Sequence, residues 1–379
     1  MQTVGIICEY NPLHRGHKKQ LRLARTLGAE GIVCLMSGNF VQRGAPAIID
    51  KSLRAAAAVE CGADLVLELP VTAALSSAEG FAAEGVRLLG SFCDELCFGA
   101  ETADAALLLS TAQALLSTDF SSALRQQLDQ GLSFPAARVK ALEAMGLEAS
   151  LLNRPNNILA VEYCKAILSL GCTMKPLPIH REGDYHDREA DVENPSATAI
   201  RERMVQAGHW EELLPVQAQT LFQGASLHTL EAGERAVLAA LRTMSDADFE
   251  ALPYGSEGLW RKLMHASRHC ARLEEIAAEV KSKRYTRTRI DRMVMCAFLG
   301  ITKAALQSPA PYARVLAFND RGREILKQAR LTGSYPNIGE KLGHPYEVLE
   351  TRADDLYGLF AAIPEAPGVA NQRRVIYQK

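Results

Sequence analysis

Residues 3–21 read Thr-Val-Gly-Ile-Ile-Cys-Glu-Tyr-Asn-Pro-Leu-His-Arg-Gly-His-Lys-Lys-Gln-Leu, and this stretch decides the fold. Residues 3–8 form an apolar run that is typical of a buried parallel strand. Asn11 is a good helix N-cap and Pro12 suits the first helical position, so a helix is predicted from about residue 14 to residue 27. Because the free N–H groups at the start of a helix attract anions, this strand-turn-helix unit predicts a phosphate site.

His14 and His17 lie on the first turn of this predicted helix. Their three-residue spacing directs both imidazoles to the same side, and Gly16 between them lets a ligand approach the backbone closely. Such a site can hold a triphosphate and stabilise the charge that develops on a leaving pyrophosphate. Two other interpretations stay open. One is a pair of surface histidines, and the other is a zinc site, although no nearby cysteine or carboxylate completes an obvious ligand set.

The composition limits the class of protein. A length of 379 residues favours two domains, and 48% hydrophobic residues allow a sizeable core. The net charge of -2 excludes a general attraction to nucleic acid but leaves room for a local basic patch. We see no signal peptide and no apolar run that approaches 18 residues, so we expect a cytoplasmic protein that does not enter a membrane.

Nine cysteines, an odd number, are scattered mostly through apolar stretches, which argues against a disulfide framework. Cys93 and Cys97 are spaced like a metal-binding pair, but they flank apolar residues of a predicted strand. We therefore expect buried thiols there, and we predict no metal ligand in the protein.

Apolar runs alternate with helical patterns through the first half of the chain. This alternation predicts a Rossmann-like α/β domain with a doubly wound parallel sheet, and it places the functional site at the carboxyl ends of the strands. The predicted strands are residues 3–8, 31–36, 64–68, 94–98 and 174–179. The helices predicted between them are residues 14–27, 50–61, 76–90, 102–116, 121–130 and 134–145.

Polar residues follow the second and fourth predicted strands. In the loop of residues 37–44, hydroxyl, amide and guanidinium groups suit a carboxylate or phosphate, although an ordinary surface loop remains the alternative. Lys51 stands at a helix start, where the dipole disfavours a cation, so we assign it to phosphate or substrate. Gly99 either lets an adenosine lie close to the backbone or simply ends its strand. The loop residues that we assign to substrate are Ser37, Asn39, Gln42 and Arg43.

A second group of polar residues lies between residues 153 and 201. Asn156 or Asn157 either contacts the ligand or caps the helix that follows. A strand end at residue 179 leads into a polar loop, residues 180–187, that contains Arg181. Ser196 or Thr198 can then cap another helix, whose free N–H groups bind phosphate, and Arg201 follows one turn later.

His14-Arg15-Gly16-His17 resembles the first signature of the nucleotidyltransferase superfamily, and residues 196–201 resemble the second. This superfamily includes the class I aminoacyl-tRNA synthetases. The resemblance implies that ATP is clasped between the two signatures, with Mg²⁺, and that His14, His17, Lys51 and Arg201 position and stabilise the phosphates. Ala197 stands where a second hydroxyl is usual, so one phosphate contact is missing or comes from a backbone N–H. The residues that we assign to ATP are Ile7, Cys8, Glu9, Tyr10, Asn11, Pro12, Leu13, His14, Gly16, His17, Lys18, Gln20, Gly99, Asn156, Arg181, Ser196 and Thr198.

From residue 207 the pattern changes to helices without convincing strands, at residues 210–222, 227–242, 246–251, 257–279 and 286–299. We therefore predict a nucleotidyltransferase domain over residues 1–206 and a mainly helical domain over residues 207–379. Within residues 281–292, six cations and one acid give a local charge of +5, with Tyr285 among them. Basic side chains beside a stackable ring suit RNA, and a solvated helix face is the alternative. We assign Lys283, Arg284, Tyr285, Arg287 and Arg289 to tRNA.

Six stretches resemble one bacterial family within the superfamily, whose members acetylate the wobble cytidine of elongator tRNA(Met). The resemblance implies that free acetate and ATP give acetyl-adenylate and pyrophosphate, after which the cytidine N4 takes the acetyl group. For that second step the sequence offers only weak candidates for a general base: His180, Asp184 and Asp50. It predicts no oligomeric state. The six stretches are residues 9–17, 37–44, 46–51, 155–159, 196–201 and 283–286.

Two alternatives remain. A small-molecule adenylyltransferase shares both signatures, but it does not account for a helical half with a basic segment. An RNA-binding protein with a vestigial nucleotide site is the other, and the presence of both histidines and Arg201 argues against such decay.

Overall fold

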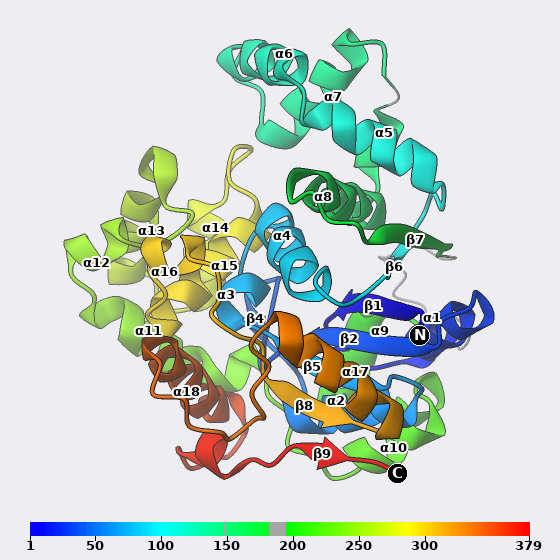
Figure 1. Ribbon diagram of the computed structural model, residues 1–379. Helices are drawn as coiled ribbons and strands as arrows, with labels where there is room; N and C mark the ends of the chain where they lie inside the picture. The colour runs from blue at the N-terminus through cyan, green and yellow to red at the C-terminus, as the bar shows by residue number, and fades with distance from the viewer. Residues whose placement is uncertain (148, 182–194) are drawn as a thin grey trace.

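A seven-stranded sheet forms the centre of the protein in a computed structural model that describes residues 1–147, 149–181 and 195–379 (Figure 1). The strand order is β7-β6-β1-β2-β5-β8-β9, and the first five are parallel to one another. The predicted Rossmann-like doubly wound sheet is therefore confirmed, with the ends of each predicted strand within two residues of their observed positions. The strands are β1 (Thr3–Cys8), β2 (Gly31–Ser37), β5 (Leu65–Leu69), β6 (Glu95–Ala100), β7 (Lys175–His180), β8 (Val315–Phe318) and β9 (Ile376–Tyr377).

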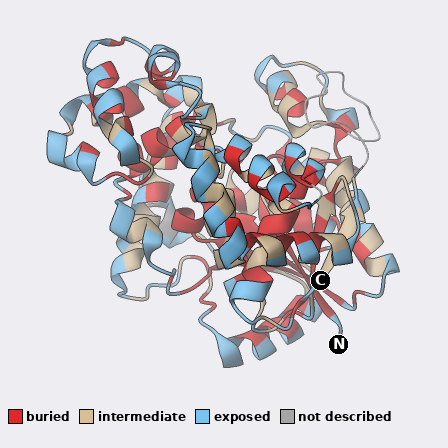
Figure 2. Ribbon diagram, turned by 90° about the horizontal axis from the view of Figure 1, so that it is seen from above, coloured by how far each residue is buried: buried red, intermediate tan, exposed pale blue. Residues whose placement is uncertain are grey.

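Successive residues of the central strands pack on opposite faces of the sheet, as the two-residue period of a strand requires. In β2, Cys34 belongs to the core on one face and Leu35 to the core on the other. The first face is covered by α1 (Arg15–Thr26), α2 (Lys51–Glu60), α9 (Ala197–Val205) and α10 (Val216–Phe222). The second face is covered by α4 (Ala78–Leu89), α8 (Pro155–Ser169) and α17 (Asp320–Thr332). Figure 2 shows buried strands in the middle of the molecule and exposed outer helix faces.

The position of β1 between β2 and β6 places the opening stretch at the centre of the sheet. Gly5 allows α4 to pack closely on β1, because a Cβ at this residue would lie 2.8 Å from the Leu89 side chain. Because these strands are parallel, the loops that follow β1, β2 and β6 open at the same edge of the sheet, where a doubly wound fold places its ligand.

Three helices form an insertion between β6 and α8, and they project from the top of the molecule in Figure 1. These are α5 (Ala105–Leu115), α6 (Thr118–Asp129) and α7 (Phe134–Ala144).

The second half of the chain contains a separate core of helices, which Phe40, Val71 and Leu75 of the first half also join. A prediction that this half lacks strands is wrong, because β8 pairs antiparallel with β5 and β9 pairs with β8. α9 and α10, on either side of residue 206, pack against the same face of the sheet. The sheet and its core thus extend across the predicted domain boundary.

The remaining helices differ in detail from the predicted ones. The helix predicted over residues 257–279 is two helices, because Cys270 adopts an extended conformation between them. No described helix is long and apolar enough to cross a membrane. The remaining helices are α3 (Val71–Ala74), α11 (Leu230–Thr243), α12 (Asp246–Glu250), α13 (Leu259–His269), α14 (Leu273–Val280), α15 (Arg287–Leu299), α16 (Lys303–Gln307) and α18 (Pro345–Tyr357).

All nine cysteines are free thiols, as expected. Burial raises the pKa of Cys97 to about 12, so this thiol is protonated and is a poor metal ligand.

Candidate active site

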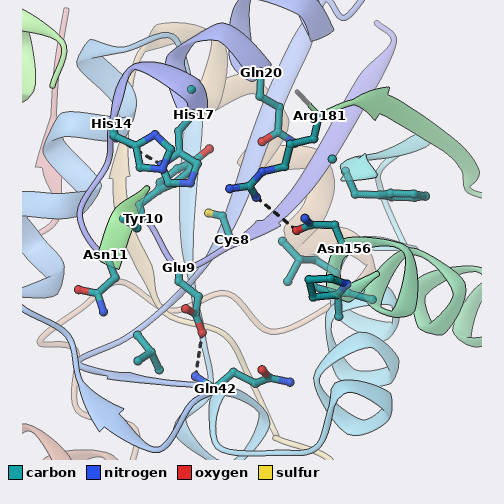
Figure 3. A pocket seen from close by; sticks show the side chains of 18 of the residues that line it. Cys8, Glu9, Tyr10, Asn11, His14, His17, Gln20, Gln42, Asn156 and Arg181 are labelled. Carbon is teal, nitrogen blue, oxygen red and sulfur yellow. Dashed lines mark hydrogen bonds between the residues drawn. The ribbon is translucent and has the colours of Figure 1, made fainter. Parts of the chain in front are cut away.

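A cavity of about 420 Å³ lies at the carboxyl ends of β1, β6 and β7. Helices α1, α8 and α9 surround it, together with a short hairpin of β3 (Phe40–Val41) and β4 (Ala45–Pro46) (Figure 3). The structure brings most of the predicted site residues together here. Those that line the cavity are Ile7, Cys8, Glu9, Tyr10, Asn11, His14, Gly16, His17, Gln20, Gln42, Arg43, Gly99, Asn156, Arg181, Ser196, Thr198 and Arg201.

The two histidines stack on each other at the start of α1, with ring centroids 3.6 Å apart. His14 is the N-cap of α1, so the prediction that Asn11 caps the helix is wrong. Asn11 instead accepts a hydrogen bond from the backbone N–H of Ile48 at 2.8 Å, which ties the turn to the neighbouring loop. Gly16 leaves room for the His14 ring, because a Cβ there would lie only 3.1 Å from it.

Both histidines are neutral at pH 7. Burial and the charges of Arg181 and Arg201 lower the pKa of His14 to about 3. Burial, His14 and Arg181 lower the pKa of His17 well below its ordinary value. The Nδ1 atom of His17 accepts the backbone N–H of His14 at 3.3 Å, so its proton is on Nε2.

The Nδ1 atom of His14 is buried, and no described residue forms a hydrogen bond with it. A buried polar atom without a partner in the protein is suited to a ligand. The histidines therefore offer neutral hydrogen-bonding groups to a phosphate.

Arg201, on α9, forms the opposite wall of the cavity. Its Nη1 donates to the backbone carbonyl of Asn11 at 2.7 Å, and its Nη2 donates to the hydroxyl of Thr198 at 3.0 Å. Ser196 is the N-cap residue of α9, but its side chain forms no capping hydrogen bond. The first turn of α9 and its arginine thus face the histidine pair across the turn after β1, in a geometry that suits phosphate.

The third wall is built by the loop after β6 and the start of α8. The carboxylate of Glu101 accepts from the backbone N–H of Asn156 at 3.2 Å and from that of Asn157 at 2.7 Å. It also accepts from the side-chain amide of Asn156, whose carbonyl oxygen accepts from Arg181 at 3.3 Å. Glu101 therefore caps α8 and orients Asn156 toward the cavity, a role that we did not assign from the sequence. Gly99 lies beside this wall, and a Cβ there would lie 3.8 Å from the Arg181 side chain.

Lys51 does not line the cavity, which corrects its assignment to phosphate. Its Nζ lies 2.7 Å from Glu68 and 2.8 Å from Asp354, and the side chain is 4% exposed. Asn39 accepts from the backbone N–H of Lys51 at 2.9 Å and donates to Asp354 at 3.0 Å. Ser37 is also fully buried outside the cavity. Lys51, Asn39 and Ser37 therefore support the loops rather than reach a ligand in this cavity.

Pro12, Leu13 and Lys18 also lie outside the cavity lining. Leu13 is buried in the core, and Lys18 donates to Gln217 of α10 at 3.0 Å. Lys19, which was not assigned to ATP, lines the cavity in place of its neighbour Lys18.

Arg54, on α2, is fully buried and does not line the cavity. It donates to the backbone carbonyls of Ile49 at 2.8 Å, Glu9 at 2.6 Å and Ser37 at 3.1 Å, and also to that of Gly38. One guanidinium therefore fixes the loops after β1 and β2. An arginine within an alanine-rich helix was the only sequence signal for this role.

Most of the basic segment, residues 281–292, is already engaged with the protein. Arg284 pairs with Glu257, and Arg287 pairs with Glu274 and Asp291. Tyr285 is 4% exposed, so the prediction that it stacks on an unpaired base is wrong. Arg289 donates to the backbone carbonyl of Tyr254 at 2.7 Å and lies over the Tyr285 ring. Lys283 is exposed, and no described carboxylate pairs with it.

This segment lies next to the cavity. Arg292 donates to the backbone carbonyl of Gln42 at 3.4 Å, and a Cβ at Gly44 would clash with the backbone of Arg292. Gly44 has a φ of +78°, which favours glycine, so the hairpin turn is shaped to fit against α15.

The weak candidates for a general base differ in position. His180 lines the cavity, Asp50 is paired with Arg373 at 2.5 Å, and Asp184 lies outside the described residues. The zinc interpretation gains no support, because no described histidine, cysteine or carboxylate joins His14 and His17 in a group of three that could share a metal.

Comparisons with known proteins agree with this geometry. The family model described as HIGH Nucleotidyl Transferase matches residues 1–368. A protein of Clostridium novyi named tRNA(Met) cytidine acetate ligase is 38% identical over 356 residues, covering 89% of each chain. A protein of the same name from Clostridium perfringens is 38% identical, covering 90% of each chain.

Solved structures give the same result. The apo form of Thermotoga maritima TmcAL has a TM-score of 0.91 and 29% identity, covering 100% of this chain and 99% of its own. The form of that protein bound with alpha-thio ATP has a TM-score of 0.88 over the same shares of the two chains. The chain therefore belongs to the HIGH nucleotidyl transferase family, among the tRNA(Met) cytidine acetate ligases.

Proposed function

We propose that the protein is an ATP-dependent ligase that activates acetate and transfers the acetyl group to N4 of the wobble cytidine of elongator tRNA(Met). The observation that carries this proposal is the cavity wall made by His14, His17, Arg181 and Arg201. It presents hydrogen-bonding and cationic groups beside two helix N-termini, in a chain 38% identical to proteins named for this reaction. A tRNA substrate would place the enzyme in the cytoplasm.

In the first half-reaction, an acetate oxygen bonds to the α-phosphorus of ATP. The bond from that phosphorus to the bridging oxygen of pyrophosphate breaks, and acetyl-adenylate forms. Negative charge grows on the leaving pyrophosphate. His14 and His17 stabilise this step by position and hydrogen bonding, and Arg201 stabilises it by charge, rather than by proton transfer. The neutral state of both histidines supports this division of roles.

In the second half-reaction, the cytidine N4 bonds to the acetyl carbonyl carbon, and the bond from that carbon to the AMP oxygen breaks. The hairpin that carries Gln42 and Arg43 lies between the cavity and the basic segment. This arrangement supports entry of the tRNA from the helical half of the chain.

Mg²⁺ accompanies ATP in phosphoryl transfer, where it neutralises the phosphate oxygens. Among the described residues of the cavity lining, Glu9 is the single carboxylate, and one of its oxygens already accepts a hydrogen bond from the protein. These residues do not make a protein-held Mg²⁺ site. We infer that the ion enters with the nucleotide, held by phosphates and water.

Exchange of labelled pyrophosphate into ATP tests the proposal. We expect exchange that depends on added acetate, because acetyl-adenylate formation is reversible. Exchange only with a phosphorylated cofactor precursor would instead identify a small-molecule adenylyltransferase. Protein that binds tRNA but gives no AMP from ATP and acetate would be an RNA-binding protein with a vestigial site.

A further inference from the structure

The cavity has two chemically different ends (Figure 3). His14, His17 and Arg181 lie together at one end, whereas Glu9 lies at the other end beside Gln42. Phosphates are attracted to the first end and repelled by a carboxylate. The end with Glu9 is therefore suited to a different part of the reaction, one that presents a hydrogen-bond donor.

Glu9 is held in place at two points. Its Oε1 accepts the backbone N–H of Gln42 at 2.8 Å, and its own backbone carbonyl accepts from Arg54 at 2.6 Å. Arg54 is fully buried, so the residue has little freedom to move. No described residue donates a hydrogen bond to the other carboxylate oxygen, Oε2. That oxygen is left to accept from a ligand.

The hairpin that holds Glu9 through Gln42 also supplies apolar walls to the cavity, which suit a flat ring. Val41, Ala45, Pro46 and Phe81 are apolar and line the same cavity. Behind this hairpin lies the basic segment, through the contact of Gly44 with α15. A base that reaches the cavity from an RNA on the helical half would arrive at the end that holds Glu9.

We propose that this end is the subsite for the acceptor cytosine, and that Glu9 accepts a hydrogen bond from its exocyclic amine and then takes its proton. Carboxylates are suited to this amine, which is the donor that distinguishes cytosine. The inference rests on the proposed function and names the general base that the sequence did not reveal.

The step balances as follows. The N4 lone pair forms the bond to the acetyl carbonyl carbon, and one N4 proton moves to Oε2 of Glu9. The bond from the carbonyl carbon to the AMP oxygen breaks, and the electron pair leaves with AMP. Glu9 then returns the proton to water.

Glu9→Gln is the variant that tests this role, because a glutamine oxygen still accepts the Gln42 N–H but the side chain takes no proton. Acetate-dependent pyrophosphate exchange measures the first half-reaction. Single-turnover transfer from preformed acetyl-adenylate to elongator tRNA(Met) measures the second. We expect transfer to fall about 100-fold or more, the size of a general-base contribution, while exchange stays within about fivefold of wild type.

The ratio of transfer to exchange is the quantity to compare, because both assays count only folded enzyme. Glu9→Asp keeps a carboxylate one methylene shorter and should recover part of the transfer rate. Glu324→Gln, at an exposed ion pair on α17, is the matched control and should leave the ratio unchanged.

Two results would overturn the inference. Transfer by Glu9→Gln within threefold of wild type would show that no proton passes to this residue. An equal loss of exchange and transfer would place Glu9 in the adenylation step instead. Failure of the proposed function looks different, because the wild-type protein itself would then show no acetate-dependent exchange.

Discussion

The Lys51→Met variant should unfold more easily than the wild type, because Lys51 stabilises the fold and is not a phosphate contact. The Nζ of Lys51 lies 2.7 Å from Glu68 and 2.8 Å from Asp354, and the three side chains are 4%, 12% and 8% exposed. Burial opposes the charge, but Asp354 and Glu68 hold the pKa of Lys51 above its ordinary value. Removing the lysine leaves two buried carboxylates without the cation that pairs with both of them.

Loss of one partner from a buried ion pair costs about 3–5 kcal/mol, and we expect a decrease of that size in the free energy of unfolding. Urea denaturation followed by circular dichroism measures it. Lys51→Met combined with Glu68→Gln and Asp354→Asn removes all three charges and should recover most of the loss. The reasoning is refuted if Lys51→Met unfolds within about 1 kcal/mol of wild type yet loses pyrophosphate exchange, which is the behaviour of a phosphate ligand.

Three further predictions concern the histidines and the basic segment. His17→Ala should reduce pyrophosphate exchange at least about 100-fold while tRNA binding in a gel-shift assay is unchanged; retained exchange would contradict the site. Because the pKa of His14 is about 3 in the folded state and about 6.5 when unfolded, its contribution to stability should fall as the pH drops below 6.5, by about 2 kcal/mol at pH 5. The pKa of His17 is lowered too, so urea titrations of His14→Phe should show a decrease that is smaller than that of wild type by about 2 kcal/mol, and an equal decrease would contradict the prediction. Lys281→Glu with Lys283→Glu should weaken tRNA binding and lower the salt slope by about 2, and unchanged binding would remove these lysines from the interface.

The sheet was predictable because its central strands β1 and β2 are apolar runs of six and seven residues, and the other parallel strands have mainly apolar residues between turn or helix signals. β8 was not, because four residues that follow a loop give too short a run to separate from a helix. The sequence also does not reveal the break at Cys270 between α13 and α14. No glycine or proline marks it, and the two helices that it separates pack into the same core.

The sequence predicts those site residues whose position depends on local secondary structure. His14, His17 and Arg201 follow from helix starts, which local sequence reveals. Lys51 was misassigned because its two carboxylate partners lie 17 and 303 positions away in the chain, on β5 and α18. Tyr285 was misassigned because its burial depends on packing against the residues around Glu257, to whose carbonyl it donates at 2.7 Å.

The most direct test of the central claim is incubation of the protein with ATP, isotope-labelled acetate and elongator tRNA(Met), followed by mass analysis of the nucleosides. The account predicts labelled N4-acetylcytidine at the wobble position, formed together with AMP and pyrophosphate. Unmodified cytidine, with wild-type protein that binds both ATP and the tRNA, would contradict it.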